Sequence, residues 1–172
     1  MENGKINILV TGIGGDIGIG IVKILIEIKY HKILVGCDIN EYPANKLDVS
    51  SFYVAPRANN KEQYLSFIKQ ICTSHEINLI IPSSEIEIKT LSDNKLIFGD
   101  KVKILINHNE IINTFMDKLQ TIDFFKTNGI KHPKTFDIKE FSNQLNYPFL
   151  LKDKFTQGSK GVVKIEDADD FV

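Results

Sequence analysis

The 172-residue sequence contains no tryptophan, two cysteines and five prolines. Cys37 and Cys72 lie in apolar stretches, and neither belongs to a CxxC or histidine-rich pattern, so we expect reduced core thiols. No apolar run reaches the length of a membrane span, and the N-terminus lacks the basic and apolar regions of a signal peptide. We therefore expect a cytoplasmic protein that is not inserted in a membrane.

An excess of charge of one sign is also missing. The 21 basic and 22 acidic residues give a formal net charge of −1, and no Lys or Arg run stands out. The sequence therefore does not favour nucleic acid or an anionic membrane as a partner. Hydrophobic residues make up 42% and charged residues 25% of the chain, which is typical of a globular protein that acts on small molecules.

Apolar runs alternate with helical stripes through the first hundred residues. This alternation predicts an α/β fold with a Rossmann-like, mostly parallel sheet. From about residue 108 the pattern changes to helical segments followed by a β-hairpin, which predicts a first domain over 1–107 and a second over 108–172. The strands of the first domain are expected at 6–11, 31–38, 51–56, 77–84 and 102–107.

A glycine-rich turn, TGIGGDIG at 11–18, follows the first predicted strand. Gly12, Gly14 and Gly15 permit positive φ and close backbone approach, and the helix after them would offer N–H groups to a phosphate. Asp38 ends the second strand, where a ribose-binding carboxylate would stand. The turn alone therefore predicts an NAD(P)-binding protein.

The same glycines and the same aspartate also suit a tight strand-to-helix turn that binds nothing. The catalysis of a short-chain dehydrogenase needs a Tyr and a Lys four residues apart, well down the chain. Tyr42 and Lys46 have this spacing, but they directly follow the second strand, and Pro43 interrupts any helix between them. The oxidoreductase interpretation thus has a cofactor turn without catalytic residues.

Two lysines stand out in the second half. Asp117 and Gln120 have the spacing of a capping box, and the Asn128-Gly129 pair is a helix stop, so a helix is expected over about 118–128. Lys118 then lies in its first turn, where a cation opposes the helix dipole unless it faces an anion. Lys152 ends an apolar strand, where a lysine needs an anion or open solvent.

A polar, glycine-bearing loop follows Lys152 and joins two predicted strands of a hairpin. Its small residues, hydroxyl, backbone donors and cation would suit a loop that closes over phosphates, although each feature also occurs in ordinary surface turns. The residues concerned are Gln157, Gly158, Ser159, Lys160 and Gly161.

Taken together and in order, these motifs resemble the ATP-grasp superfamily, and most closely its carbamoyl-phosphate-synthase-like members. The resemblance covers essentially the whole chain: a Rossmann-like pre-ATP-grasp domain, then the first part of an α+β ATP-grasp domain with its DK helix, a segment like IKHPKTF and a strand ending in lysine. It implies that Lys118, Lys152 and residues 157–161 bind ATP, and that the first glycine turn is architectural or helps to form the acceptor site.

The resemblance further implies an ATP-dependent ligase that activates a carboxylate as an acyl phosphate, which an amine or similar nucleophile then attacks. The Mg²⁺ ligands are expected beyond residue 172, with none within this chain, so the chain alone is expected to be inactive. A homodimer or a complementing polypeptide would be compatible with such an enzyme. The acceptor-substrate crevice would involve Gly12, Gly14, Gly15, Asp38, Ser83, Ser84 and Glu85, although the two serines and Glu85 also suit a helix cap with an acidic first turn.

Two alternatives stay open at this point. One is a nicotinamide-dependent Rossmann oxidoreductase, based on the glycine turn and Asp38. The other is a non-catalytic interaction module that keeps the fold and has lost the chemistry.

Overall fold

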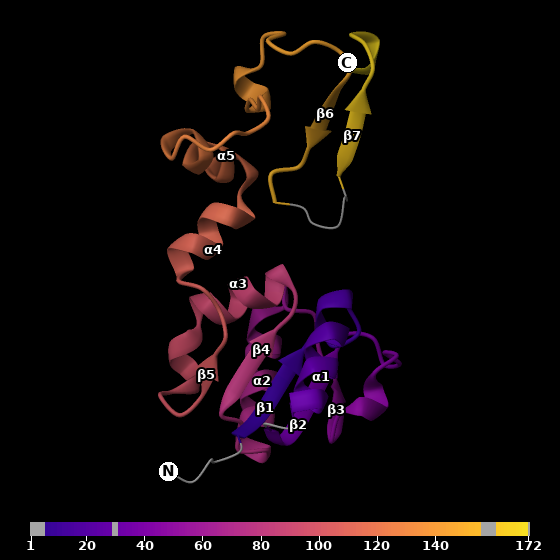
Figure 1. Cartoon of the computed structure of the whole chain (residues 1–172), viewed down its shortest axis with the longest axis vertical. Coiled ribbons are helices and arrows are strands. Elements are labelled where there is room, and N and C mark those ends of the chain that lie inside the picture. The colour runs from indigo at the N-terminus through magenta and orange to yellow at the C-terminus, as the bar shows by residue number, and fades with distance from the viewer. Residues whose placement is uncertain (1–5, 29–30, 156–160, 172) are drawn as a thin grey trace. The chain divides into compact units, whose positions relative to one another are not determined.

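The structure is a computed structural model that describes residues 6–28, 31–155 and 161–171. The chain divides into two compact units, Met1–Asn109 and Glu110–Val172, which Figure 1 colours from indigo to yellow along the chain. No helix in the described part is long and apolar enough to cross a membrane.

The first unit contains a five-stranded sheet in the order β3-β2-β1-β4-β5, and every pairing is parallel (Figure 1). The predicted Rossmann-like sheet is therefore confirmed. Its strands are β1 (Ile6–Thr11), β2 (His31–Asp38), β3 (Ser51–Val54), β4 (Leu79–Pro82) and β5 (Lys103–Ile104). Its helices are α1 (Asp16–Ile28), α2 (Lys61–Ser74) and α3 (Glu85–Asp93), with 3-10 turns η1 (Lys46–Asp48) and η2 (Lys95–Phe98).

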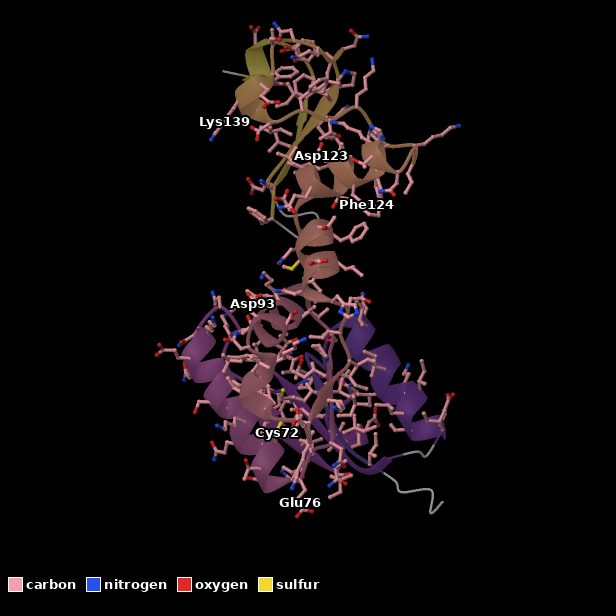
Figure 2. The ribbon with its side chains drawn as sticks, turned by 90° about the vertical axis from the view of Figure 1, so that its left-hand side faces the viewer. Cys72, Glu76, Asp93, Asp123, Phe124 and Lys139 are labelled. Atoms are coloured by element: carbon pink, nitrogen blue, oxygen red, sulfur yellow. The ribbon has the colours of Figure 1, made fainter. Side chains whose placement is uncertain are left out.

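Two apolar clusters hold the sheet, one on each face. On one face α2 and α3 pack against the strands through residues such as Tyr64, Ile68 and Leu91. On the other face α1 packs through Val22 and Leu25, and Figure 2 shows α1 and α2 on opposite sides of the sheet. Because β1 is central, its side chains enter both clusters, and each fully buried aliphatic side chain contributes about 1.5–3 kcal/mol.

The helix α1 buries only part of the apolar stripe in its sequence, because Leu25 and Ile21 pack on the sheet while other members of the stripe are exposed. The isoleucines at helical spacing include Ile17, Ile24 and Ile28, which are 65%, 58% and 58% exposed. The face that meets the sheet is formed by Gly18, Val22 and Leu25. The helix is therefore apolar nearly all round, and periodicity alone does not identify its buried side.

The second unit contains helices and an antiparallel hairpin. Its elements are α4 (Asn109–Met116), α5 (Lys118–Thr127), η3 (Ile138–Glu140), β6 (Phe149–Lys152), β7 (Val162–Ile165) and η4 (Asp169–Phe171). Strands β6 and β7 pair antiparallel, with Lys152 opposite Val162. Leu150 and Lys152 on β6 are exposed and Phe149 and Leu151 are half-buried, which is the alternation of a strand with one covered face.

Candidate functional site

A pocket of about 1100 Å³ lies within the second unit, and it is lined by α5, β6, β7 and the segment between α5 and β6. Its walls are largely apolar, with aromatic side chains from several elements. Several lysines line the pocket together with these apolar side chains. The lining includes Lys118, Lys152, Asp153, Lys154 and Gly161, together with Phe125, Phe136, Phe141 and Phe149.

Asp117 begins α5 as its N-cap. Its carboxylate accepts hydrogen bonds from the N–H groups of Leu119 (2.9 Å) and Gln120 (3.2 Å). The Gln120 side chain also donates to this carboxylate, at 3.0 Å, whereas a capping box would direct it to the N-cap backbone N–H. The helix therefore starts where the sequence predicts, although Gln120 has a different partner.

The carboxylate of Asp117 also pairs with Lys154, which lies two residues beyond the end of β6. The Lys154 Nζ is 2.9 Å from Asp117 Oδ2, and Asp117 is 2% exposed. Burial alone would raise the pKa of Asp117, but hydrogen bonds from Lys154 and from the N–H groups of Gln120 and Leu119 outweigh it, so the pKa lies below its usual value. The sequence analysis did not single out Lys154, although the sequence Lys-Asp-Lys at 152–154 places a second lysine directly after the strand that ends in Lys152.

Lys118 and Lys152 both line this pocket. The backbone N–H of Lys118 donates to the carbonyl of Lys154 at 3.3 Å, and the Lys118 Nζ is 3.4 Å from the same oxygen. The chain therefore brings the first turn of α5 against the segment that directly follows Lys152. Lys118 and Lys152 are far apart in sequence but lie in the same region of the pocket wall.

The base of the glycine-bearing loop is described in part. Gly161 has φ +63° and its carbonyl accepts a hydrogen bond from the Asp153 N–H at 3.1 Å. A Cβ at position 161 would meet the Asp153 side chain, and the positive φ also favours glycine there. Gln157, Gly158, Ser159 and Lys160 lie outside the described residues.

The glycine turn of the first unit is supported from two sides. Gly12 has φ +65°, and its carbonyl accepts a hydrogen bond from Ser83 Oγ at 2.8 Å. Asp38 accepts from the N–H groups of Gly14 (2.7 Å) and Asn40 (2.8 Å), one on each carboxylate oxygen. These contacts give Ser83 and Asp38 a role in shaping the turn.

The segment after β4 contributes Ser84 and Glu85. Ser84 is the N-cap of α3 in extended conformation, but its hydroxyl donates to Glu87 Oε2 at 2.7 Å instead of binding the helix backbone. Glu85 is exposed at the first position of the helix. The structure therefore brings Ser83 and Gly12 into direct contact, while Gly15 bonds within the turn to the Gly12 carbonyl.

A buried carboxyl group, Glu87, lies beside this turn and was not predicted. Tyr64 from α2 donates to its Oε1 at 3.1 Å, and Glu87 is 7% exposed. Burial raises the pKa of Glu87 above its usual value, the Ser84 and Tyr64 hydroxyls lower it in part, and the charge of Asp38 raises it further. The sequence signal for the Ser84–Glu87 hydrogen bond was the capping-box spacing, a serine followed three residues later by a glutamate.

Cys37 and Cys72 are buried free thiols. Burial raises the pKa of Cys72 to about 12 and that of Cys37 well above its usual value, so both stay protonated near neutral pH. Within the described ranges no group of three or more His, Cys, Asp or Glu side chains could hold a metal ion.

No protein-family model matches this sequence, and no curated protein matches it. Solved structures are similar in fold. N5-carboxyaminoimidazole synthetase from Staphylococcus aureus, solved with ADP, is 22% identical with a TM-score of 0.68 and aligns over 99% of this chain and 44% of its own. The L-amino acid ligase from Bacillus licheniformis is 13% identical with a TM-score of 0.71, over 99% of this chain and 41% of its own.

A third similar structure is the biotin carboxylase domain of the Hydrogenobacter thermophilus 2-oxoglutarate carboxylase, a dimer in complex with MgADP, ADP and bicarbonate. It is 17% identical with a TM-score of 0.70, over 97% of this chain and 39% of its own. This chain thus spans about two fifths of the length of these proteins. It has the fold of the N-terminal region of ATP-grasp enzymes, a Rossmann-like sheet followed by the beginning of an α+β ATP-grasp domain.

Proposed function

We propose that this chain is the N-terminal part of an ATP-dependent ligase that activates a carboxylate as an acyl phosphate for attack by an amine or similar nucleophile. The observation that carries the proposal is the pocket of the second unit, where Lys118, Lys152 and Gly161 line one cavity. The fold supports it, since S. aureus N5-carboxyaminoimidazole synthetase was solved with ADP.

The electrostatics of the pocket suit a polyphosphate. Asp117 already occupies the N–H groups of Leu119 and Gln120, so the proposal assigns the phosphates to side-chain ammonium groups and not to the end of α5. Lys118 and Lys152 would each provide a charge-assisted hydrogen bond. The apolar and aromatic walls would exclude water and strengthen these bonds.

The chemistry assigned to these lysines is charge neutralisation. While the terminal phosphoryl group moves to a carboxylate oxygen, negative charge spreads over the phosphoryl oxygens, and fixed cations stabilise it. Gln157, Gly158, Ser159 and Lys160 complete the proposal as residues that cover the phosphates. ATP is the proposed co-substrate, and Mg²⁺ accompanies it without ligands assigned from the described residues.

The acceptor side of the proposal uses the carboxyl end of β1 and β4 in the first unit. Ligands of open α/β sheets bind at such edges. The exposed Glu85 could attract an amine, while Ser83 and Asp38, which hold the glycine turn through the contacts above, would act through the turn's shape. Gly12, Gly14, Gly15 and Ser84 belong to the same proposed edge.

The partners proposed for this chain are small molecules of carboxylate and amine type. A second copy is a further proposed partner, because the H. thermophilus biotin carboxylase domain was solved as a dimer. A cytoplasmic location and the absence of nucleic-acid and membrane partners remain part of the same proposal.

Isothermal titration of the chain with MgATP tests the nucleotide site. We expect binding that Lys152→Ala weakens about tenfold, the loss of one charge-assisted hydrogen bond. Lys126→Ala is the matched control, because Lys126 is an exposed lysine on α5 that pairs with Asp123 and does not line the pocket. Absence of ATP binding, or equal effects of the two substitutions, would contradict the proposal.

A titration with NADH, followed by its fluorescence, tests the nicotinamide alternative on the same chain. Under the proposed function we expect no fluorescence enhancement at cofactor concentrations that saturate ordinary dehydrogenases. Enhancement that Asp38→Ala abolishes would instead support the oxidoreductase interpretation.

A further inference from the structure

Lys154 is connected to the start of α5 through both its side chain and its backbone. Its ammonium group pairs with Asp117 Oδ2 at 2.9 Å. Its carbonyl accepts from the N–H of Lys118 at 3.3 Å and from the Lys118 Nζ at 3.4 Å. These contacts join the exit of β6 to the first turn of α5.

The carboxylate at the other end of this link has little freedom to move. Asp117 is almost completely buried and accepts from Lys154, from the Gln120 side chain and from two backbone N–H groups of α5. Lys154 is 44% exposed, so its ammonium group is held at the edge of the buried carboxylate. A buried carboxylate that lost this cation would remain without charge compensation.

The same link sets the position of the two lysines proposed to bind phosphates. Lys118 follows Asp117 directly, and Lys152 precedes Lys154 by two residues. Next to Lys154, Asp153 bonds to Gly161 at the end of the loop. A change at the Asp117–Lys154 pair would therefore shift Lys118, Lys152 and the base of the loop together.

We propose that Lys154 is a positioning residue: its pairing with Asp117 fixes the first turn of α5 against the exit of β6 and so sets the spacing of Lys118 and Lys152. The proposal assigns Lys154 no phosphate contact, because its ammonium group already pairs with Asp117. This inference rests on the proposed function, since it concerns the same site. It assigns a role to Lys154, which the sequence motifs did not include.

The substitution Asp117→Asn separates positioning from simple electrostatics by the sign of its effect. Asparagine is as good an N-cap as aspartate, so α5 is retained while the negative charge is removed. If the cations acted by charge alone, removal of a nearby carboxylate would strengthen ATP binding. If the pair positions the site, ATP binding weakens, and we expect about a fivefold loss of affinity.

Lys154 is tested with two substitutions. Lys154→Met removes the ammonium group and should weaken MgATP binding by the same factor as Asp117→Asn, with no further loss in the double variant. Lys154→Arg can still reach the carboxylate and should restore binding. Tighter binding by Asp117→Asn, or independent losses that multiply in the double variant, would overturn the inference.

A measurement without ATP keeps this inference separate from the proposed function. Trace acetylation of the whole chain with acetic anhydride, followed by mass spectrometry, reports the reactivity of each lysine. We expect Lys154 to react about fivefold more slowly than the exposed Lys126, and Asp117→Asn to remove this protection. Equal acetylation rates of Lys154 and Lys126 in the wild-type chain would overturn the Asp117–Lys154 pairing, whether or not the chain binds ATP. A protected Lys154 in a chain that does not bind ATP would contradict only the proposed function.

Discussion

The two units bury their side chains to very different extents. The first unit has an apolar cluster on each face of its sheet, with fully buried residues on β1, β2 and β4 and on α1, α2 and α3. In the described part of the second unit the buried apolar residues are Ile112, Ile122 and Ile165. The first unit is therefore organised by apolar packing, whereas polar links such as the Asp117–Lys154 pair have a larger share in the second.

The two units also treat a buried carboxyl group in opposite ways. Within the described part of the chain, Glu87 in the first unit meets hydroxyl donors and no cation, so its pKa is raised. Asp117 in the second meets a lysine and two backbone N–H groups, so its pKa is lowered. The number and charge of the hydrogen-bond donors, and not burial alone, decide whether the pKa of a buried carboxyl group is raised or lowered.

The largest expected effect comes from the apolar core of the first unit. Ile68 in α2 is completely buried, and Ile68→Ala should lower the free energy of unfolding by about 2–5 kcal/mol, because a cavity remains. Ile122→Ala in α5 should cost less, since Ile122 lines an existing pocket. Urea unfolding followed by hydrogen exchange of peptides from each unit measures both.

The control for this comparison is Ile24→Ala on the exposed side of α1, which should change the free energy of unfolding by less than about 0.5 kcal/mol. A loss at Ile24 as large as that at Ile68 would show that the outer face of α1 is covered in solution. A loss at Ile122 equal to that at Ile68 would break the contrast between the two units.

Two glycines of α1 give a smaller effect with opposite signs. A Cβ at Gly18 would collide with the carbonyl oxygen of Gly12 and lie 2.7 Å from Ile13 Cα, whereas a Cβ at Gly20 would meet nothing within 4 Å. Gly18→Ala should therefore destabilise the first unit by about 1–3 kcal/mol. Gly20→Ala should stabilise it by about 0.5–1 kcal/mol, and thermal unfolding of both variants checks the signs. Destabilisation by Gly20→Ala would contradict the open space at that position.

The sequence predicted the first unit well because its signals are local. The apolar runs correspond to β1 and β2 at the expected residues, and α2 buries residues at helical spacing, Tyr64, Ile68 and Cys72. In the second unit, the equally local capping pattern at Asp117 correctly places the start of α5. Each of these features depends on neighbours within a few positions.

The missed features depend on residues far apart in the chain. Lys154 meets Asp117 through a pairing that only the packing of the β6 exit against α5 creates. Glu87 meets Tyr64 across 23 positions, through the packing of α3 beside α2. The packed face of α1 was equally hidden, because isoleucines occur on several of its sides. The ATP-site lysines remain a prediction, since sharing a pocket does not establish what the pocket binds.

The sharpest test of the two carboxyl groups is the pH dependence of stability. For Glu87 the folded pKa exceeds the unfolded value of about 4.3, so the first unit loses stability as pH rises from there through the folded pKa. A tenfold difference between the folded and unfolded acid dissociation constants corresponds to about 1.4 kcal/mol. The charged and titratable groups around Glu87 are Asp38, Tyr64 and Cys37, and Asp38 reinforces the trend.

The substitution Glu87→Gln keeps a hydrogen-bonding side chain but cannot ionise, so urea unfolding of the first unit should no longer show this decline as the pH rises above the unfolded pKa of about 4.3. Glu85→Gln, which changes an exposed carboxylate in the same helical turn, should leave the decline intact. Asp117 should behave in the opposite sense: its folded pKa is lowered, so the second unit keeps its stability above about pH 4 and loses it as the pH falls through the folded value. Hydrogen exchange resolved by unit would separate the two trends, and parallel pH dependence in both units would show that the donors around these carboxyl groups do not set their protonation.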